Sequence, residues 1–230
     1  TGWMAKQADG SVMVRSGDNA VLVTAVSSKR ESGLDFFPLT VEYTEKFYAT
    51  GRIPGGYFKR EGRPTSAQLF TCRLIDRPLR PLFPEGYNYE TQIIATVVSA
   101  DGGFPVEILA SVGASAALHI SNVPFNGPNA SIQVAKVDGK LVGNPSLEDL
   151  ERAELDMIVS GSRRGISMVE GECEFISESD ALEALKFGHQ ELLSVLDAQD
   201  ELREKTGNKE KRVFEPRQID AAFKSSVEEF

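Results

Sequence analysis

Short apolar segments separated by turn residues predict a fold with many strands and few helices. Strand-like segments, rich in Val, Ile and Thr, cover residues 11–15, 20–28, 39–43, 91–99, 131–137, 140–142, 155–160 and 166–169. Helical spacing of apolar residues covers 65–74, 106–120 and 179–197. The segment TQIIATVVS at 91–99 is apolar on both faces, so we expect it in the interior of a sheet. The pattern as a whole predicts an α+β domain.

Proline, glycine and charge set the limits of these elements. A loop is predicted over residues 51–64, where glycine and proline recur, and Pro78 is expected to end or kink the helix that follows. Residues 198–215, AQDELREKTGNKEKRVFE, are highly charged and predict a linker or a frayed segment. We therefore divide the chain into a core at 1–197, a charged linker at 198–215 and the start of a helical domain at 216–230.

The composition is that of an ordinary globular domain, with 41% hydrophobic and 26% charged residues. It excludes a disordered tail and a disulfide-stapled mini-protein. No apolar run approaches the length of a membrane span, so we expect no membrane partner. Cys72 and Cys173 stand far apart and outside any Cys/His cluster, which predicts no structural zinc and a reducing, cytoplasmic location.

Charge is unevenly distributed along the chain. The net charge of −9 argues against indiscriminate binding to nucleic acid. Between Arg52 and Arg80, however, seven basic residues stand against two acidic ones, which gives a local charge of +5. Concentrated positive charge on an acidic chain indicates that an anion binds at one place.

The loop segment RIPGGYFKREGRP at 52–64 is the sharpest feature of this basic window. Two adjacent aromatic residues are followed by three cations: Tyr57, Phe58, Lys59, Arg60 and Arg63. Exposed rings can stack on bases while cations hold the phosphates, a combination suited to single-stranded nucleic acid. In the alternative interpretation both rings enter the core and the cations form a solvated rim. Composition alone leaves these two interpretations level.

Three arginines follow in the segment RLIDRPLR at 73–80. Arg73 and Arg77 are four residues apart and share a helix face, with Arg80 three residues further along. They are candidate phosphate contacts. A buried ion pair with Asp76 is the simpler account, and on these residues alone we favour it.

Longer stretches of the chain resemble the polynucleotide phosphorylase family. The similarity is strongest in GRIPGGYFKREGRPTSAQLFTCRLIDRPLRPLFPEG at 51–86 and continues through DFFPLTVEY at 35–43, IIATVVS at 93–99, GASAAL at 113–118, PFNGP at 124–128 and MVEGE at 168–172. Bacterial members of the family contain two ribonuclease PH-like cores with a helical domain between them. The resemblance therefore implies that this chain is the first core, with mixed sheets and packed helices similar to ribosomal protein S5 domain 2, followed by the start of the helical domain.

The resemblance also implies an activity and partners. The family degrades single-stranded RNA, including mRNA, from its 3′ end: inorganic phosphate attacks the terminal linkage, a nucleoside diphosphate leaves, and Mg²⁺ is required. Three subunits form a homotrimeric ring whose pore, lined by the aromatic–basic loop, admits the RNA; a larger RNA-degradation complex is a further candidate partner. On this basis we assign RNA binding to Tyr57, Phe58, Lys59, Arg60, Arg63, Arg73, Arg77 and Arg80.

The same resemblance implies that this core has no catalytic or metal-binding residues. In the family's second core a run of serines binds phosphate, and two aspartates and a lysine act at the reaction centre. The stretch that matches the serines, GGFPV at 102–106, has no hydroxyl, and of the second set only Asp156 is present. Leu150 and Ile158 stand in the other two positions. Because a lone carboxylate is a poor Mg²⁺ site, we expect the metal ligands of the whole enzyme outside this chain.

These observations support two hypotheses for the function of this chain. The first, which we favour, is a non-catalytic core that guides RNA and builds the ring of a phosphorolytic exoribonuclease. The second is a free-standing RNA-binding or assembly module of the same fold. A start at Thr1 without methionine and an end at Phe230 within a predicted helix favour the first. A core with its own phosphorolytic site is disfavoured by Gly103, Leu150 and Ile158.

Overall fold

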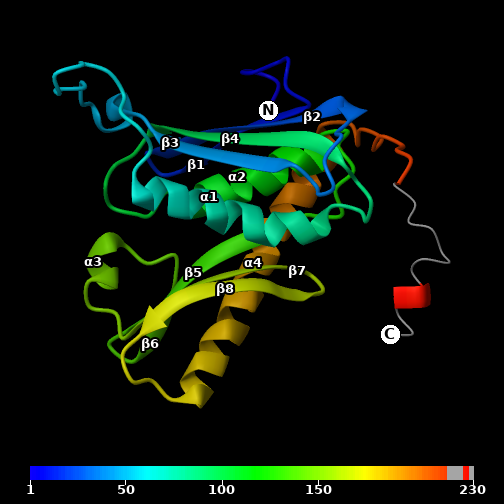
Figure 1. The fold of residues 1–230 in the computed structure, drawn as a ribbon. Coiled ribbons are helices and arrows are strands. Elements are labelled where there is room, and N and C mark those ends of the chain that lie inside the picture. The colour runs from blue at the N-terminus through cyan, green and yellow to red at the C-terminus, as the bar shows by residue number, and fades with distance from the viewer. Residues whose placement is uncertain (217–224, 228–230) are drawn as a thin grey trace.

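The computed structural model describes residues 1–216 and 225–227, which fold around two four-stranded sheets. The first sheet has the order β1 (Gly10–Ser16), β2 (Asn19–Glu31), β4 (Tyr89–Ser99), β3 (Leu39–Glu45); the second has the order β6 (Lys140–Gly143), β5 (Ala130–Val137), β7 (Leu155–Ser162), β8 (Gly165–Cys173). The helices are α1 (Ser66–Leu79), α2 (Glu107–Ile120), α3 (Leu147–Leu150) and α4 (Glu178–Lys205), with short 3₁₀-helices η1 (Phe47–Thr50) and η2 (Arg80–Leu82). α1 and α2 lie between the two sheets, and α4 packs along the second sheet (Figure 1).

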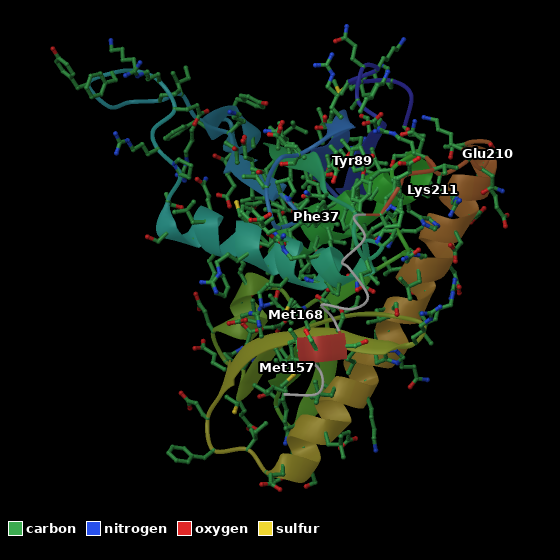
Figure 2. All side chains as sticks on the ribbon, turned by 45° about the vertical axis from the view of Figure 1, so that its right-hand side comes forward. Phe37, Tyr89, Met157, Met168, Glu210 and Lys211 are labelled. Carbon is green, nitrogen blue, oxygen red and sulfur yellow. The ribbon has the colours of Figure 1, made fainter. Side chains whose placement is uncertain are left out.

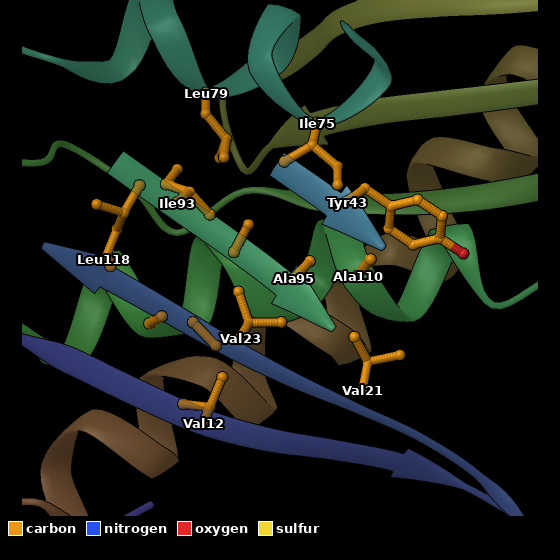
Figure 3. Packing of buried hydrophobic residues seen from close by; sticks show 14 of the residues in the cluster. Val12, Val21, Val23, Tyr43, Ile75, Leu79, Ile93, Ala95, Ala110 and Leu118 are labelled. Carbon is orange, nitrogen blue, oxygen red and sulfur yellow. The ribbon is translucent and has the colours of Figure 1, made fainter. Parts of the chain in front are cut away.

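The first sheet is built around β4, which lies between β2 and β3 as the apolar run predicts. β4 pairs antiparallel with β2 and parallel with β3. Its alternate residues Ile93, Ala95 and Val97 are fully buried, and the first two are seen in the core beside Val23 and Ile75 (Figure 3). The small residues of α2 allow that helix to approach the sheet closely.

α1 begins where the sequence predicts but ends later. Thr65 caps it: the Thr65 hydroxyl accepts from the Gln68 N–H at 3.2 Å, and the Gln68 side chain accepts from the Thr65 N–H at 3.1 Å. The prediction that the helix ends near residue 74 is wrong, because α1 runs through Pro78 to Leu79. Ile75 and Leu79 are fully buried, and this apolar burial outweighs the backbone hydrogen bond that proline cannot donate.

α4 extends beyond the helix predicted from its apolar spacing. The expected linker at 198–215 is wrong for residues 198–205, which form the C-terminal part of α4. Gln199 is buried and its amide donates to a backbone carbonyl at 2.8 Å. Asp200 shares a hydrogen bond of 2.9 Å with His119 of α2. Polar side chains in this stretch thus have protein partners, so a high charge content did not prevent ordered packing.

Residues 209–214 of the expected linker also pack on the core. Lys211, labelled in Figure 2, donates from its ammonium to three backbone carbonyls at the C-terminal end of α2, and the three hydrogen bonds measure 2.9, 3.1 and 2.9 Å. Arg212 donates to two carbonyls of β2 and forms an ion pair with Asp9 at 2.7 Å. The predicted helical start at 216–230 falls largely outside the described residues. Within 1–216 and 225–227, no helix combines the length and the apolarity needed to cross a membrane.

Candidate nucleic-acid interface

The aromatic–basic loop, residues 51–65, projects from one end of the first sheet between η1 and α1 (Figure 1). Tyr57 and Phe58 at its tip are 95% and 71% exposed. Their ring centroids are 5.3 Å apart at an interplanar angle of 82°, and the Arg60 guanidinium lies 5.1 Å from the centroid of the Phe58 ring. The interpretation in which both rings enter the core is therefore wrong.

The base of this loop is fixed and its tip faces solvent. The Phe47 N–H of η1 donates to Glu61 Oε1 at 3.1 Å, which ties the second half of the loop to the body of the protein. Lys59 adopts the left-handed region, with φ of 48°, and closes the turn at the tip. Like Arg60 and Arg63, Lys59 is exposed and forms no ion pair within the described residues. These three cations are free to meet an anion.

Arg73 and Arg77 of α1 and Arg80 of η2 line an open hollow between α1 and β8, which we call the arginine hollow. Its volume is about 710 Å³ and its walls are formed by Arg73, Asp76, Arg77, Arg80, Pro81, Ser167, Met168 and Val169. Met168 lies on β8, in the layer below α1 (Figure 2). The structure thus separates the eight predicted residues into five on the loop and three in this hollow.

The three arginines of the hollow differ in how many of their donors are already used. Arg80 donates from Nε and Nη2 to both oxygens of Asp76, at 2.8 and 2.6 Å, and to two backbone carbonyls at 2.9 and 3.3 Å. Arg77 makes one ion pair, from Nη1 to Glu170 Oε2 at 2.5 Å. Arg73 has no hydrogen bond or ion pair within the described residues. The expected ion pair of Asp76 is therefore with Arg80, and it lies at the surface instead of being buried.

The positions that match the reaction centre of the family's second core lie around a separate and largely apolar hollow. It has a volume of about 240 Å³, and both Leu150 and Ile158 form part of its wall. Asp156 accepts a hydrogen bond from the Gln133 amide at 2.8 Å. In residues 1–216 and 225–227, no group of three or more His, Cys, Asp or Glu side chains could hold a metal ion. Glu107 is the carboxylate in the wall of this hollow, and Asp156 lies in a neighbouring hollow with Glu170 and Glu172. The donors at Leu150 and Ile158 do not fit Mg²⁺, because one carboxylate among apolar side chains is a poor site for that ion.

Two carboxylates at or beside these hollows were not singled out by the sequence. Glu107, at the start of α2, lines the apolar hollow; burial there raises the pKa of its carboxyl, and the nearby Glu45 charge adds to the shift. Glu170 on β8 meets Arg77, which precedes it by 93 residues. No local spacing could indicate that contact, because it exists only once the two sheets are packed around α1.

Comparison with known proteins assigns the chain to a family. The model described as "3′ exoribonuclease family, domain 1" matches residues 1–124, which contain the first sheet with α1 and α2. The model described as "3′ exoribonuclease family, domain 2" matches residues 127–191, which contain the second sheet and the first half of α4. The chain belongs to the 3′ exoribonuclease family. The two parts of this family's fold thus correspond to the two sheets.

Relatives in the 3′ exoribonuclease family extend the similarity over nearly the whole chain. Polyribonucleotide nucleotidyltransferase of Bdellovibrio bacteriovorus is 65% identical over 228 residues, which are 99% of this chain and 33% of that protein. The protein of the same name from Anaeromyxobacter dehalogenans is 54% identical over 228 residues, 99% of this chain and 32% of that protein. The chain therefore spans about a third of the length of these relatives. The resemblance to polynucleotide phosphorylases is confirmed.

A solved structure confirms the expected fold. The crystal structure of rice (Oryza sativa) Rrp46 matches with a TM-score of 0.68 over 88% of this chain and 90% of that chain. At 16% identity this match concerns the fold alone. Together with the family models it establishes the ribonuclease PH-like α+β architecture of mixed sheets and packed helices.

Proposed function

We propose that this chain is the first core of a phosphorolytic 3′-to-5′ exoribonuclease. The observation that carries the proposal is its 65% identity, over 99% of the chain, to a polyribonucleotide nucleotidyltransferase. The whole enzyme uses inorganic phosphate to cleave the 3′-terminal linkage of single-stranded RNA and releases a nucleoside diphosphate at each step. We place the enzyme in the cytoplasm, in keeping with two cysteines that are both free.

Within that enzyme we assign this core the role of guiding RNA. The exposed rings of Tyr57 and Phe58 suit stacking on bases. The cations beside them, which form no ion pair in the part of the chain that the structure describes, suit contacts to the flanking phosphates. Arg73 offers a further phosphate contact in the arginine hollow. These features concentrate positive charge on a chain of net charge −9, so the remaining surface does not compete for RNA.

We further propose that this core helps to build a homotrimeric ring. Large apolar side chains near the loop are exposed: Phe47 by 41%, Tyr48 by 59% and Ile53 by 86%. Exposed apolar residues gathered at one place are typical of protein–protein contact. In a three-fold ring the loop is presented three times around one axis, so a threading strand meets an aromatic platform from every subunit. A larger RNA-degradation complex remains a prediction for the assembled enzyme.

We assign no catalytic step to this core. The hollow shared by Leu150 and Ile158 has no serine in its wall and one carboxylate, Glu107. We propose that the Mg²⁺ of the whole enzyme is bound by residues outside this chain. The role of this core is to bind and orient RNA ahead of the reaction.

The test is phosphorolysis by the full-length protein that contains this chain. We expect ADP to be released from poly(A) in the presence of phosphate and Mg²⁺, and no release when phosphate is omitted. Release of AMP by water would contradict the proposed reaction. A full-length protein that binds poly(A) and releases no nucleotide would instead favour a binding or assembly module.

A further inference from the structure

The charges of the arginine hollow are almost balanced. Its three guanidinium groups face two carboxylates, Asp76 and Glu170, each held by one arginine. Only Arg73 is left without a partner among the described residues. A phosphate that approaches this surface therefore meets one uncompensated positive charge, although three arginines are present.

The two ion pairs differ in how easily a phosphate could replace the carboxylate. Arg80 is held by four hydrogen bonds, two to Asp76 and two to backbone carbonyls, and its guanidinium also lies 5.7 Å from the centroid of the Phe37 ring. Arg77 is held by one contact, to Glu170, and their side chains are 52% and 34% exposed. Exposed pairs with a single contact contribute little to stability because water solvates both partners when they separate. Arg77 can therefore change partner, whereas Arg80 cannot do so without breaking the hydrogen bonds that join α1 to the start of β3.

We propose that Glu170 competes with an RNA phosphate for Arg77, and so sets how tightly the arginine hollow holds single-stranded RNA. This inference rests on the proposed role of the hollow in RNA binding. In the free protein the Glu170 carboxylate occupies the donor of Arg77 that a phosphate oxygen would use. When RNA binds, the phosphate takes that donor and the Glu170 carboxylate turns to solvent. The guanidinium fork can hold a phosphate by two parallel hydrogen bonds, which favours this exchange over the single contact to Glu170.

The neighbouring strand position offers a matched control. Glu172 lies two residues further along β8, is exposed, and forms no ion pair within the described residues. Glu170→Gln and Glu172→Gln remove the same charge at neighbouring places. Only Glu170→Gln releases Arg77, so the two variants separate competition from a general change of surface charge.

The experiment measures binding of fluorescently labelled oligoadenylate to the full-length protein, without phosphate or Mg²⁺, over a series of KCl concentrations. We expect Glu170→Gln to tighten binding about two- to fivefold, the range that corresponds to release of an exposed ion pair. The slope of log affinity against log salt should steepen by up to about 0.7, as for one more phosphate contact on a single strand. Glu172→Gln should change both quantities less. In an Arg77→Ala background, Glu170→Gln should give no gain.

Different results would overturn different parts of the reasoning. Equal tightening by Glu170→Gln and Glu172→Gln would show that Glu170 does not compete with RNA phosphate for Arg77. The same conclusion follows if Glu170→Gln binds like the unaltered protein while Arg73→Ala weakens binding, and in that case the hollow is still an RNA site. If Arg73→Ala and Arg77→Ala both leave affinity unchanged, the hollow is not an RNA site and the proposed function fails at this place. Melting curves of every variant show whether a change in affinity reflects loss of folded protein.

Discussion

Replacing both rings of the loop tip, Tyr57→Ala with Phe58→Ala, should separate RNA binding from folding. The rings are 95% and 71% exposed, so their removal returns little apolar surface to water. The substitutions remove one edge-to-face ring pair and the packing of the Arg60 guanidinium on the Phe58 ring. Loss of stability should therefore stay under about 1 kcal/mol, as is usual for exposed positions. Each base that stacks on a ring contributes about 1–3 kcal/mol, so affinity for a single strand should fall roughly 5- to 150-fold per stacked base.

The assay pairs a melting curve with the length distribution of products from a long poly(A), both in the full-length protein. We expect an almost unchanged melting temperature and a shift from fully degraded chains to a ladder of intermediates, because the RNA dissociates more often between steps. Phe175→Ala serves as the matched control, since Phe175 is also an exposed aromatic residue but lies between β8 and α4. It should leave the product lengths unchanged. A double variant that unfolds readily while processivity is intact would show that the rings stabilise the fold and do not hold RNA.

Three further predictions concern other parts of the chain. The isolated chain should release no nucleoside diphosphate from poly(A) with phosphate and Mg²⁺, and release that survives Asp156→Asn would reveal an active site elsewhere in it. Arg73→Ala should weaken RNA binding and reduce the slope of log affinity against log salt by about 0.7. Arg80→Ala should instead lower the free energy of unfolding by about 1 kcal/mol, because its hydrogen bonds are lost. An Arg73→Ala protein that is less stable but binds RNA with unchanged affinity would contradict this assignment. Burial lowers the pKa of His119, so the unfolded chain binds more protons than the folded chain just below pH 6.5. The free energy of unfolding should therefore fall as the pH drops through that region. In a series of melting curves, His119→Gln should make stability less dependent on pH.

The local sequence pattern was sufficient to predict those helices and strands that bury one face and are bounded by turns with glycine or proline. The apolar run at 91–99 predicted an interior strand, and the strand-like segments at 131–137 and 140–142 predicted β5 and β6, which pair across the turn at Asp138-Gly139. Both signals depend only on neighbours in the sequence. The loop could also be located from its glycines and prolines, but the exposure of Tyr57 and Phe58 could not, because burial depends on what the rest of the chain brings alongside.

The local sequence pattern did not predict the structure correctly where contacts between residues distant in sequence decide it. The charges of 198–205 suggested a linker, yet Gln199 and Asp200 find partners on segments far earlier in the chain and the helix continues. The contact between Arg77 and Glu170 could not be predicted for the same reason. The sequence therefore provided no basis for distinguishing Arg73, Arg77 and Arg80. Only the packed structure separates Arg80, whose donors are occupied, from Arg73, which has no hydrogen bond or ion pair within residues 1–216 and 225–227.

The most direct test of the central claim is to map where RNA touches the full-length protein. Photoreactive 4-thiouridine in a single-stranded RNA would be cross-linked in the absence of phosphate, and the attached peptides identified by mass spectrometry. We expect cross-links within residues 52–64, lost when Tyr57 and Phe58 are replaced by alanine, and others near Arg73. Cross-links confined to other parts of the protein, with none in this chain, would contradict a role for this core in guiding RNA.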